Sequence, residues 1–96
     1  MASVVVTATA QRNIRDLTRT RSLPDSTADR IRAAFQHLNA FPLSGAPLGG
    51  RWSRYRFILG PWPWLVIVYR YDSQLDRVLI TAVRDAREAT SPTGPR

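Results

Sequence analysis

The run Trp64–Tyr71 constrains the fold of this chain more than any other segment, because it is almost wholly apolar. A membrane-spanning helix needs about 20 apolar residues, so a run of this length is of strand size. Central strands that are covered on one or both faces have this composition. The chain is therefore expected to be built around such a strand.

Two segments before this run predict a strand and a helix. Ser3–Thr7 contains three consecutive valines, a β-branched run that suits a buried strand. Apolar residues then recur at helical spacing, which predicts a first helix over Ala10–Arg21 with Thr9 as its N-cap. Pro24 lies in the turn that ends this helix.

A second helix is predicted to follow Pro24, with Asp25 or Ser26 as its N-cap. Its apolar stripe consists of Ala28, Ile31, Ala34 or Phe35, and Leu38. Proline disfavours a helical conformation in the residue before it, so Pro42 ends the helix. The short break between the two helices favours a helical hairpin.

The segments around the apolar run predict two more strands. Phe41–Gly50 is rich in proline and glycine and is predicted to be a loop. Alternation over Arg51–Leu59 then predicts a strand, and Arg77–Arg84 predicts the last one. One face of the first of these strands would carry Trp52, Arg54, Arg56 and Ile58, and the other Tyr55, Phe57 and Leu59.

The element order is therefore β-α-α-β-β-β, which predicts a two-layer α+β fold. Three consecutive strands with short turns form an antiparallel meander, and the helical hairpin covers its apolar face. The first strand crosses over the hairpin and joins the sheet beside the last strand. We expect one domain over residues 1–88 and a flexible polar tail over residues 89–96.

The chain is strongly basic, with 14 arginines, no lysine, seven acidic residues and a net charge of +7. This balance indicates a polyanionic target or an acidic partner. The absence of cysteine excludes disulfides and Cys-ligated metal sites, and His37 is the only histidine, so no metal or cofactor is expected. The sequence has no signal-peptide pattern, and we expect a cytoplasmic protein that does not bind membranes.

Seven parts of the sequence recur together, in this order, in one group of small basic proteins. They are Val4–Val6, Ile14–Leu17, Leu38–Pro42, Gly45 with Leu48 and Gly49, Arg54–Arg56, Val66–Tyr69 with Asp72, and Val78–Arg87. In order and spacing they resemble the RelE/ParE toxin superfamily of type II toxin–antitoxin systems, which includes plasmid-stabilisation toxins. The resemblance extends from about residue 4 to residue 88.

The resemblance implies the RelE/ParE-like fold and a cognate antitoxin, whose disordered acidic segment folds on the toxin and masks its active surface. RelE-like members cleave mRNA in the ribosome, and ParE-like members block DNA gyrase. RNA-cleaving members carry an arginine and a C-terminal histidine or tyrosine where this chain has Val66 and Asp85. Because cleavage needs a proton acceptor and a donor, these departures favour a ParE-like toxin that acts by binding.

The candidate binding residues are Trp52, Arg54, Arg56, Arg84 and Arg87. The four arginines are also the candidates for electrostatic catalysis. Together they are predicted to form a basic, aromatic-bordered surface for nucleic acid or an acidic antitoxin segment. The alternatives are a solvated sheet face for the first pair of arginines and ion pairs with Asp85 or Glu88 for the second.

Three functions remain open at this point. The leading hypothesis is a ParE-like toxin that inhibits DNA gyrase and growth and is neutralised by its antitoxin. The second is a RelE-like, ribosome-dependent mRNA endoribonuclease. The third is an inactive module that only binds its antitoxin and operator DNA.

Overall fold

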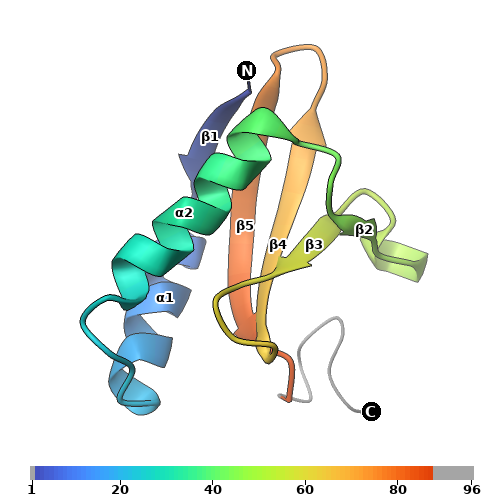
Figure 1. The fold of residues 1–96 in the computed structure, drawn as a ribbon. Helices are drawn as coiled ribbons and strands as arrows, with labels where there is room; N and C mark the ends of the chain where they lie inside the picture. The colour runs from blue at the N-terminus through green and yellow to red at the C-terminus, as the bar shows by residue number, and fades with distance from the viewer. Residues whose placement is uncertain (1, 88–96) are drawn as a thin grey trace.

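The computed structural model describes residues 2–87, and the predicted tail over residues 89–96 lies outside that range. Its elements are β1 (Ser3–Val6), α1 (Ala8–Thr20), α2 (Thr27–Ala40), β2 (Ala46–Pro47), a 3-10 helix η1 (Gly50–Trp52), β3 (Arg56–Leu59), β4 (Leu65–Asp72) and β5 (Arg77–Asp85). The predicted order is confirmed, with β2 and η1 as additions (Figure 1). Neither of the α-helices in this range is long and apolar enough to cross a membrane.

The five strands form one sheet in the order β1-β5-β4-β3-β2 (Figure 1). Strands β3, β4 and β5 form the predicted antiparallel meander. Strand β1 lies parallel to β5 and pairs Val4 with Val78 and Val6 with Ile80, which confirms its predicted place beside the last strand. Parallel neighbours require a crossover connection, and the two helices provide it.

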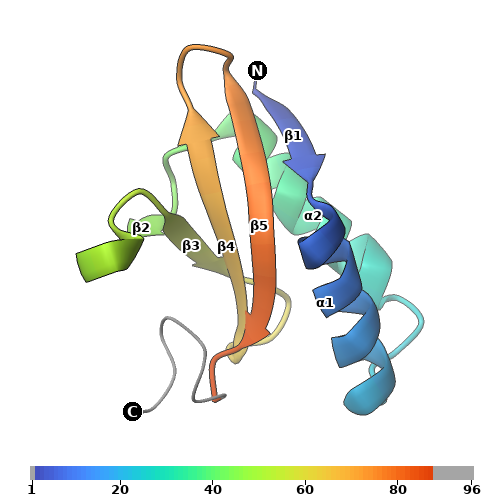
Figure 2. The ribbon, with the colours of Figure 1, turned by 180° about the vertical axis from the view of Figure 1, so that it is seen from behind.

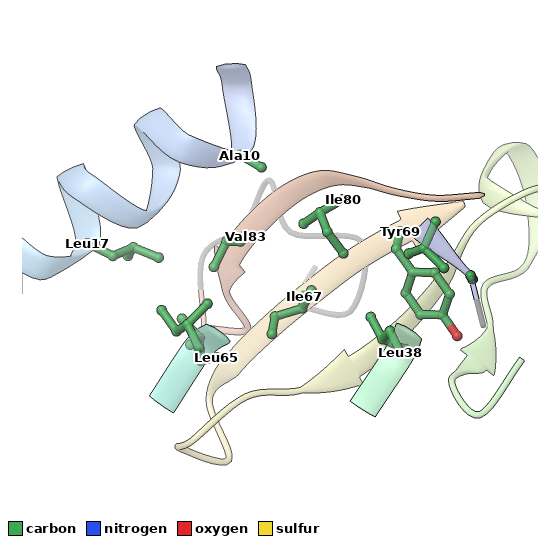
Figure 3. Close-up of a cluster of buried hydrophobic side chains, with 11 residues drawn as sticks. Ala10, Leu17, Leu38, Leu65, Ile67, Tyr69, Ile80 and Val83 are labelled. Atoms are coloured by element: carbon green, nitrogen blue, oxygen red, sulfur yellow. The ribbon is translucent and has the colours of Figure 1, made fainter. Parts of the chain in front are cut away.

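The helices and one face of the sheet enclose the core. Leu65, Ile67 and Tyr69 are alternate residues of β4, so they share this helix-side face, and Leu38 of α2 lies close to the Tyr69 ring (Figure 3). The other buried members of the core are Ala2, Ala10, Leu17, Ile31, Val78, Ile80 and Val83. Each large buried side chain contributes about 1.5–3 kcal/mol relative to exposure. The opposite face of the sheet, here called the far face, carries Val66 and Val68.

Helix α1 begins two residues earlier than predicted, because Thr7 and not Thr9 is its N-cap. The Thr7 hydroxyl accepts a hydrogen bond from the Ala10 N–H at 3.2 Å and donates one to the Ile80 carbonyl at 2.9 Å. The same side chain thus starts the helix and fixes it to β5. The sequence pattern around residues 7–9 contains no sign of this second contact.

Helix α2 agrees with its predicted ends but not with its whole predicted stripe. Ser26 is its N-cap, and it ends at Ala40, directly before Phe41. Ala28 was expected to face the core and is exposed, whereas its neighbour Thr27 is buried. The Thr27 hydroxyl donates to the carbonyl oxygen of Pro24, so burial of this polar side chain is compensated by a hydrogen bond.

The predicted strand over Arg51–Leu59 is wrong in its first half. Gly50 has a φ of 61°, a backbone conformation that glycine adopts without strain. The N–H groups of Trp52 and Ser53 then donate to carbonyls three residues earlier, which coils the chain into η1. Trp52 therefore lies in a 3-10 helix, Arg54 lies in the following turn, and only the residues from 56 onward are in a strand.

Helix α1 covers the part of β5 that β1 does not reach, because β1 pairs with β5 only as far as Ile80. Beyond that point Asn13 Oδ1 accepts a hydrogen bond from the Val83 N–H at 3.1 Å. Arg21 makes the next contact, with the side chain of Asp85. Side chains of α1 and of its C-cap thus bond to the part of β5 that has no neighbouring strand on this side. Figure 2 shows α1 continuing beside β5 from the end of β1.

Candidate functional site

Arg56 is engaged with the loop before β2. It pairs across the ladder with Tyr69, so its side chain emerges on the helix-side face, and the predicted placement on the uncovered face is wrong. Its Nη1 donates to the carbonyl oxygens of Gly45 at 2.8 Å and Leu43 at 3.5 Å. Tyr69 Oη accepts a hydrogen bond from the Gly45 N–H at 2.9 Å. Two side chains from neighbouring strands therefore hold the same glycine.

Trp52 and Arg54 lie in a short protrusion at the β2–β3 end of the sheet (Figure 1). The Trp52 ring meets Tyr55 edge-on at 5.8 Å, and the Arg51 guanidinium lies 5.7 Å from the Trp52 ring centroid. Arg54 is exposed. The structure thus groups Trp52 with Arg51 and Tyr55, and neither Trp52 nor Arg54 lies on a strand face with Arg56.

Arg84 lies on the far face of the sheet. It pairs with Val66, whose side chain points away from the helices because Leu65 and Ile67 point toward them. Arg84 and Arg56 therefore project from opposite faces. The predicted cluster of four arginines does not form.

Arg87 belongs to a cluster around Asp85, a fully buried carboxylate at the end of β5. Its Nε and Nη2 donate to the two Asp85 oxygens at 2.9 and 2.8 Å. Arg21 donates to Asp85 Oδ2 through Nη2 at 2.9 Å and Nε at 3.2 Å. The Arg87 guanidinium also lies 5.0 Å from the centroid of Trp64, which stacks on Trp62. For Arg87, the arrangement found is the alternative stated above, an ion pair with Asp85.

The electrostatics of this cluster make Asp85 a poor proton acceptor. Hydrogen bonds from Arg87, and next from Arg21, hold the pKa of Asp85 well below its ordinary value, although burial acts in the opposite direction. The same contact raises the pKa of the Arg87 guanidinium. Both carboxylate oxygens are ionised and already accept hydrogen bonds, so they have little capacity to take a further proton.

Two arginines of the far face were missed in the sequence. Arg70 pairs with Leu79 and Arg77 with Asp72, and both arginines are half-buried on the same face as Arg84. The signal was available, because the period of β4 places Arg70 opposite the core residues at 69 and 71. The side of the sheet away from the helices does carry guanidinium groups, but mostly from residues other than those predicted.

Asp72 is a carboxylate of the far face, opposite Arg77. Two tyrosines and the histidine lie elsewhere in residues 2–87. Burial raises the pKa of Tyr69, and a hydrogen bond to Asp76 at 2.6 Å raises the pKa of Tyr71. Both tyrosines are on the helix-side face. His37 lies on α2 with its ring 5.3 Å from that of Phe41. Within the same range no group of three or more His, Asp and Glu side chains is placed to hold a metal ion.

The fold is that of small RelE/ParE-type toxins. A chain of the RelBE2 toxin–antitoxin complex from Mycobacterium tuberculosis is similar, with a TM-score of 0.68 at 26% identity over 88% of this chain and 96% of that one. A copper-bound mutant toxin from Helicobacter pylori has a TM-score of 0.68 at 18% identity over 93% and 99% of the two chains. A conserved hypothetical protein of Helicobacter pylori has a TM-score of 0.59 at 15% identity, over 88% and 94%. Comparison with curated proteins found no match.

Sequence comparison identifies the family more closely. Residues 4–90 match the sequence pattern of the family described as the ParE toxin of the type II toxin–antitoxin system, parDE. The match covers most of the 96 residues, and the chain belongs to this family. It is therefore the toxin component of a type II system, in which an antitoxin is the partner.

Proposed function

We propose that this toxin inhibits DNA gyrase by binding, in the bacterial cytoplasm, and that it does not cleave RNA. The observation that carries the proposal is the state of Asp85, the residue at the position where RNA-cleaving relatives have a C-terminal histidine. Arg21 and Arg87 occupy both of its oxygens and lower its pKa. A carboxylate in this state is poorly suited to accept a proton from a 2′-hydroxyl.

The far-face arginines support a role in binding. Arg70, Arg77 and Arg84 are carried by two adjacent long strands, which hold their backbones rigidly. Guanidinium groups form bidentate hydrogen bonds with carboxylates and phosphates, the two anions that a complex of gyrase with DNA presents. The net charge of +7 adds long-range attraction that speeds encounter with such a target.

A supercoiling assay with purified gyrase tests the proposal. The toxin is expected to abolish supercoiling of relaxed plasmid in proportion to its concentration, and pre-mixing with the cognate antitoxin is expected to restore it. Full gyrase activity in the presence of excess folded toxin would contradict the proposal.

A translating extract with a defined mRNA provides the second arm. We expect intact mRNA in this extract, because Asp72, the far-face carboxylate opposite Arg77, already accepts hydrogen bonds from two backbone N–H groups. Cleavage at codon spacing would contradict the proposal and would favour ribosome-dependent RNA cleavage as the function. Expression without any growth defect would instead point to an inactive module that binds only its antitoxin and operator.

A further inference from the structure

Two half-buried arginines of the far face, Arg70 and Arg77, form no ion pair with any of the described residues 2–87. Arg70 pairs with Leu79 and Arg77 with Asp72, so the two arginines are diagonal neighbours on adjacent strands. Diagonal neighbours in an antiparallel pair are about 7–8 Å apart. Two positive charges are therefore held side by side on one rigid face, with no carboxylate bound to either.

The nearest far-face carboxylate does not neutralise this pair. Asp72 Oδ1 accepts hydrogen bonds from the N–H groups of Gln74 at 3.0 Å and Leu75 at 3.2 Å, in the turn that follows β4. Among the described residues, the Arg77 Nε is a buried donor without a hydrogen-bond partner. An unpaired buried donor on a charged group is costly. An anion bound at the outer nitrogens of the same guanidinium offsets part of that cost.

Aromatic side chains continue this surface toward the β2–β3 end of the sheet. The register of β3 with β4 brings Tyr55, directly before β3, next to Arg70, and alternation turns its side chain to the far face. The Trp52 ring meets Tyr55 edge-on at 5.8 Å, and the Arg51 guanidinium lies 5.7 Å from the Trp52 ring centroid. The name basic row is used below for these five residues: Arg77, Arg70, Tyr55, Trp52 and Arg51.

We propose that the basic row binds a strand of DNA with unpaired bases. The proposal rests on the proposed function and deepens it, because it names DNA as the part of the gyrase–DNA complex that the far-face arginines contact. Guanidinium groups bind phosphate oxygens through paired hydrogen bonds. Aromatic rings stack on bases of any sequence, since every base has a flat π-face.

The order of side chains in the basic row favours a nucleic acid over an acidic protein segment. Cations stand at both ends of the row and rings stand between them, as phosphates and bases recur along a strand. An acidic segment supplies carboxylates for the arginines but no flat partners for Tyr55 and Trp52. A second copy of this chain would bring another +7 of charge to the same face.

Fluorescence anisotropy with the whole toxin, without gyrase, tests the proposal. The probe is a fluorescein-labelled twelve-nucleotide oligothymidine, and the comparison is a DNA duplex of twelve base pairs. The toxin is expected to bind the single strand more tightly, because only unpaired bases reach the rings. Equal or tighter binding of the duplex would overturn the proposal. So would displacement of the oligothymidine by a twelve-residue glutamate peptide as readily as by unlabelled oligothymidine.

Two variants of equal net charge locate the phosphate contact. Arg70→Gln is expected to raise the dissociation constant at least about fivefold. It is also expected to lower the slope of log affinity against log salt by about 0.7, which corresponds to one phosphate of a single strand. Arg12→Gln removes an exposed arginine of α1 and is expected to weaken binding much less. Equal losses of affinity in the two variants contradict a contact at the basic row.

Two substitutions of one residue test the stacking. Tyr55→Leu is expected to weaken binding of the oligothymidine at least about fivefold, and Tyr55→Phe is expected to recover most of that loss, because phenylalanine keeps the ring. Binding by Tyr55→Leu that equals the wild type contradicts a role for the ring. Circular dichroism shows whether each variant is folded, and where Tyr55→Leu is not, the comparison of Arg70→Gln with Arg12→Gln decides.

The DNA result and the gyrase result are read separately. Oligonucleotide binding is measured with the toxin alone, and gyrase inhibition is measured by supercoiling with the wild-type toxin. A toxin that binds the oligothymidine at the basic row but leaves gyrase active refutes the gyrase target alone. A toxin that inhibits gyrase but does not bind the oligothymidine refutes the DNA contact alone.

Discussion

Arg21, at the C-cap of α1, donates two hydrogen bonds to Asp85, which lies 64 residues later at the end of β5. The contact fixes the last turn of α1 against the end of the sheet. It also places a cation at a helix C-terminus, where the helix dipole favours positive charge. The buried carboxylate thus connects the first helix with the last strand.

The first prediction concerns this carboxylate. Asp85→Asn removes the charged acceptor shared by Arg21 and Arg87 and is expected to lower the free energy of unfolding by about 1–3 kcal/mol. The loss stays below that of a fully buried pair, because the Arg21 and Arg87 side chains are 41% and 64% exposed and remain hydrated. Urea denaturation of both proteins measures the difference.

Asp29→Asn is the matched control for this substitution. Asp29 pairs with Arg32 on the exposed surface of α2, where both side chains are more than two-thirds exposed. Its loss is expected to change stability by no more than about 0.5 kcal/mol. Equal effects of the two substitutions would show that burial of Asp85 adds nothing to the pair.

The second prediction is the pH dependence of stability. The pKa of Asp85 is lower in the folded chain than in the unfolded chain, so the unfolded state takes up the proton first on acidification. The stability from Asp85 is therefore complete above an ordinary aspartate pKa of about 4 and is lost progressively below it. The unfolding free energy of Asp85→Asn is expected to fall less steeply between pH 5 and pH 2, which denaturation at a series of pH values measures. Parallel curves for the two proteins would contradict this assignment.

The third prediction concerns the close contact between Gly45 and Tyr69. A Cβ atom at position 45 would lie 2.6 Å from Tyr69 Oη and 2.7 Å from the Phe57 carbonyl oxygen. Gly45→Ala is therefore expected to destabilise the protein by about 1–3 kcal/mol, as overpacking does elsewhere. Gly49→Ala is the control, because nothing lies within 4 Å of the added atom. Thermal unfolding of the two variants measures the difference in stability. A Gly45→Ala variant as stable as the wild type would show that the loop around residue 45 shifts to accommodate the added Cβ atom.

The parts of the fold that the sequence predicted are those with a regular period. Helical spacing placed α1 and α2, and the apolar run placed β4 at the centre of the sheet. The crossover of β1 followed from the need of an apolar sheet face for cover. These inferences depend on many residues at once, so a single exception such as Ala28 does not change them.

The site was harder to predict because its contacts are specific and distant in sequence. Alternation at Trp52, Arg54 and Arg56 suggested one strand face, but Gly50 turns the chain before the strand begins. The contact of Arg21 with Asp85 joins two elements that no local pattern relates. The two-residue alternation of β4 did predict the face on which Arg70 lies, so assigning each residue of β4 to a face would have identified it.

The fourth prediction separates the two arginines that were expected to act together. Arg56→Gln loses the guanidinium that donates to the Gly45 carbonyl, and the unfolding free energy is expected to fall by about 1 kcal/mol. Arg54→Gln changes an exposed side chain in a turn and is expected to alter stability by no more than about 0.5 kcal/mol. Urea denaturation compares the two, and a larger loss in Arg54→Gln would contradict the loop contact.

The fifth prediction concerns the surface that we propose binds gyrase. Arg70 is half-buried on the far face, and Arg70→Glu reverses its charge where the proposed target binds. The concentration of toxin needed for half-maximal inhibition of supercoiling is expected to rise at least about tenfold, mainly through slower association, and this difference from the wild type is expected to shrink at higher salt, because salt screens charge.

The same reversal on α1 provides the comparison, since Arg12 is an exposed arginine of the first helix. Arg12→Glu makes the same change in net charge, so any general loss of attraction is equal in the two variants. Inhibition by Arg12→Glu is therefore expected to weaken much less than inhibition by Arg70→Glu. A greater loss of inhibition in Arg12→Glu than in Arg70→Glu would instead indicate that gyrase binds the helical hairpin. The two variants have the same net charge, so such a difference could come only from a contact at α1.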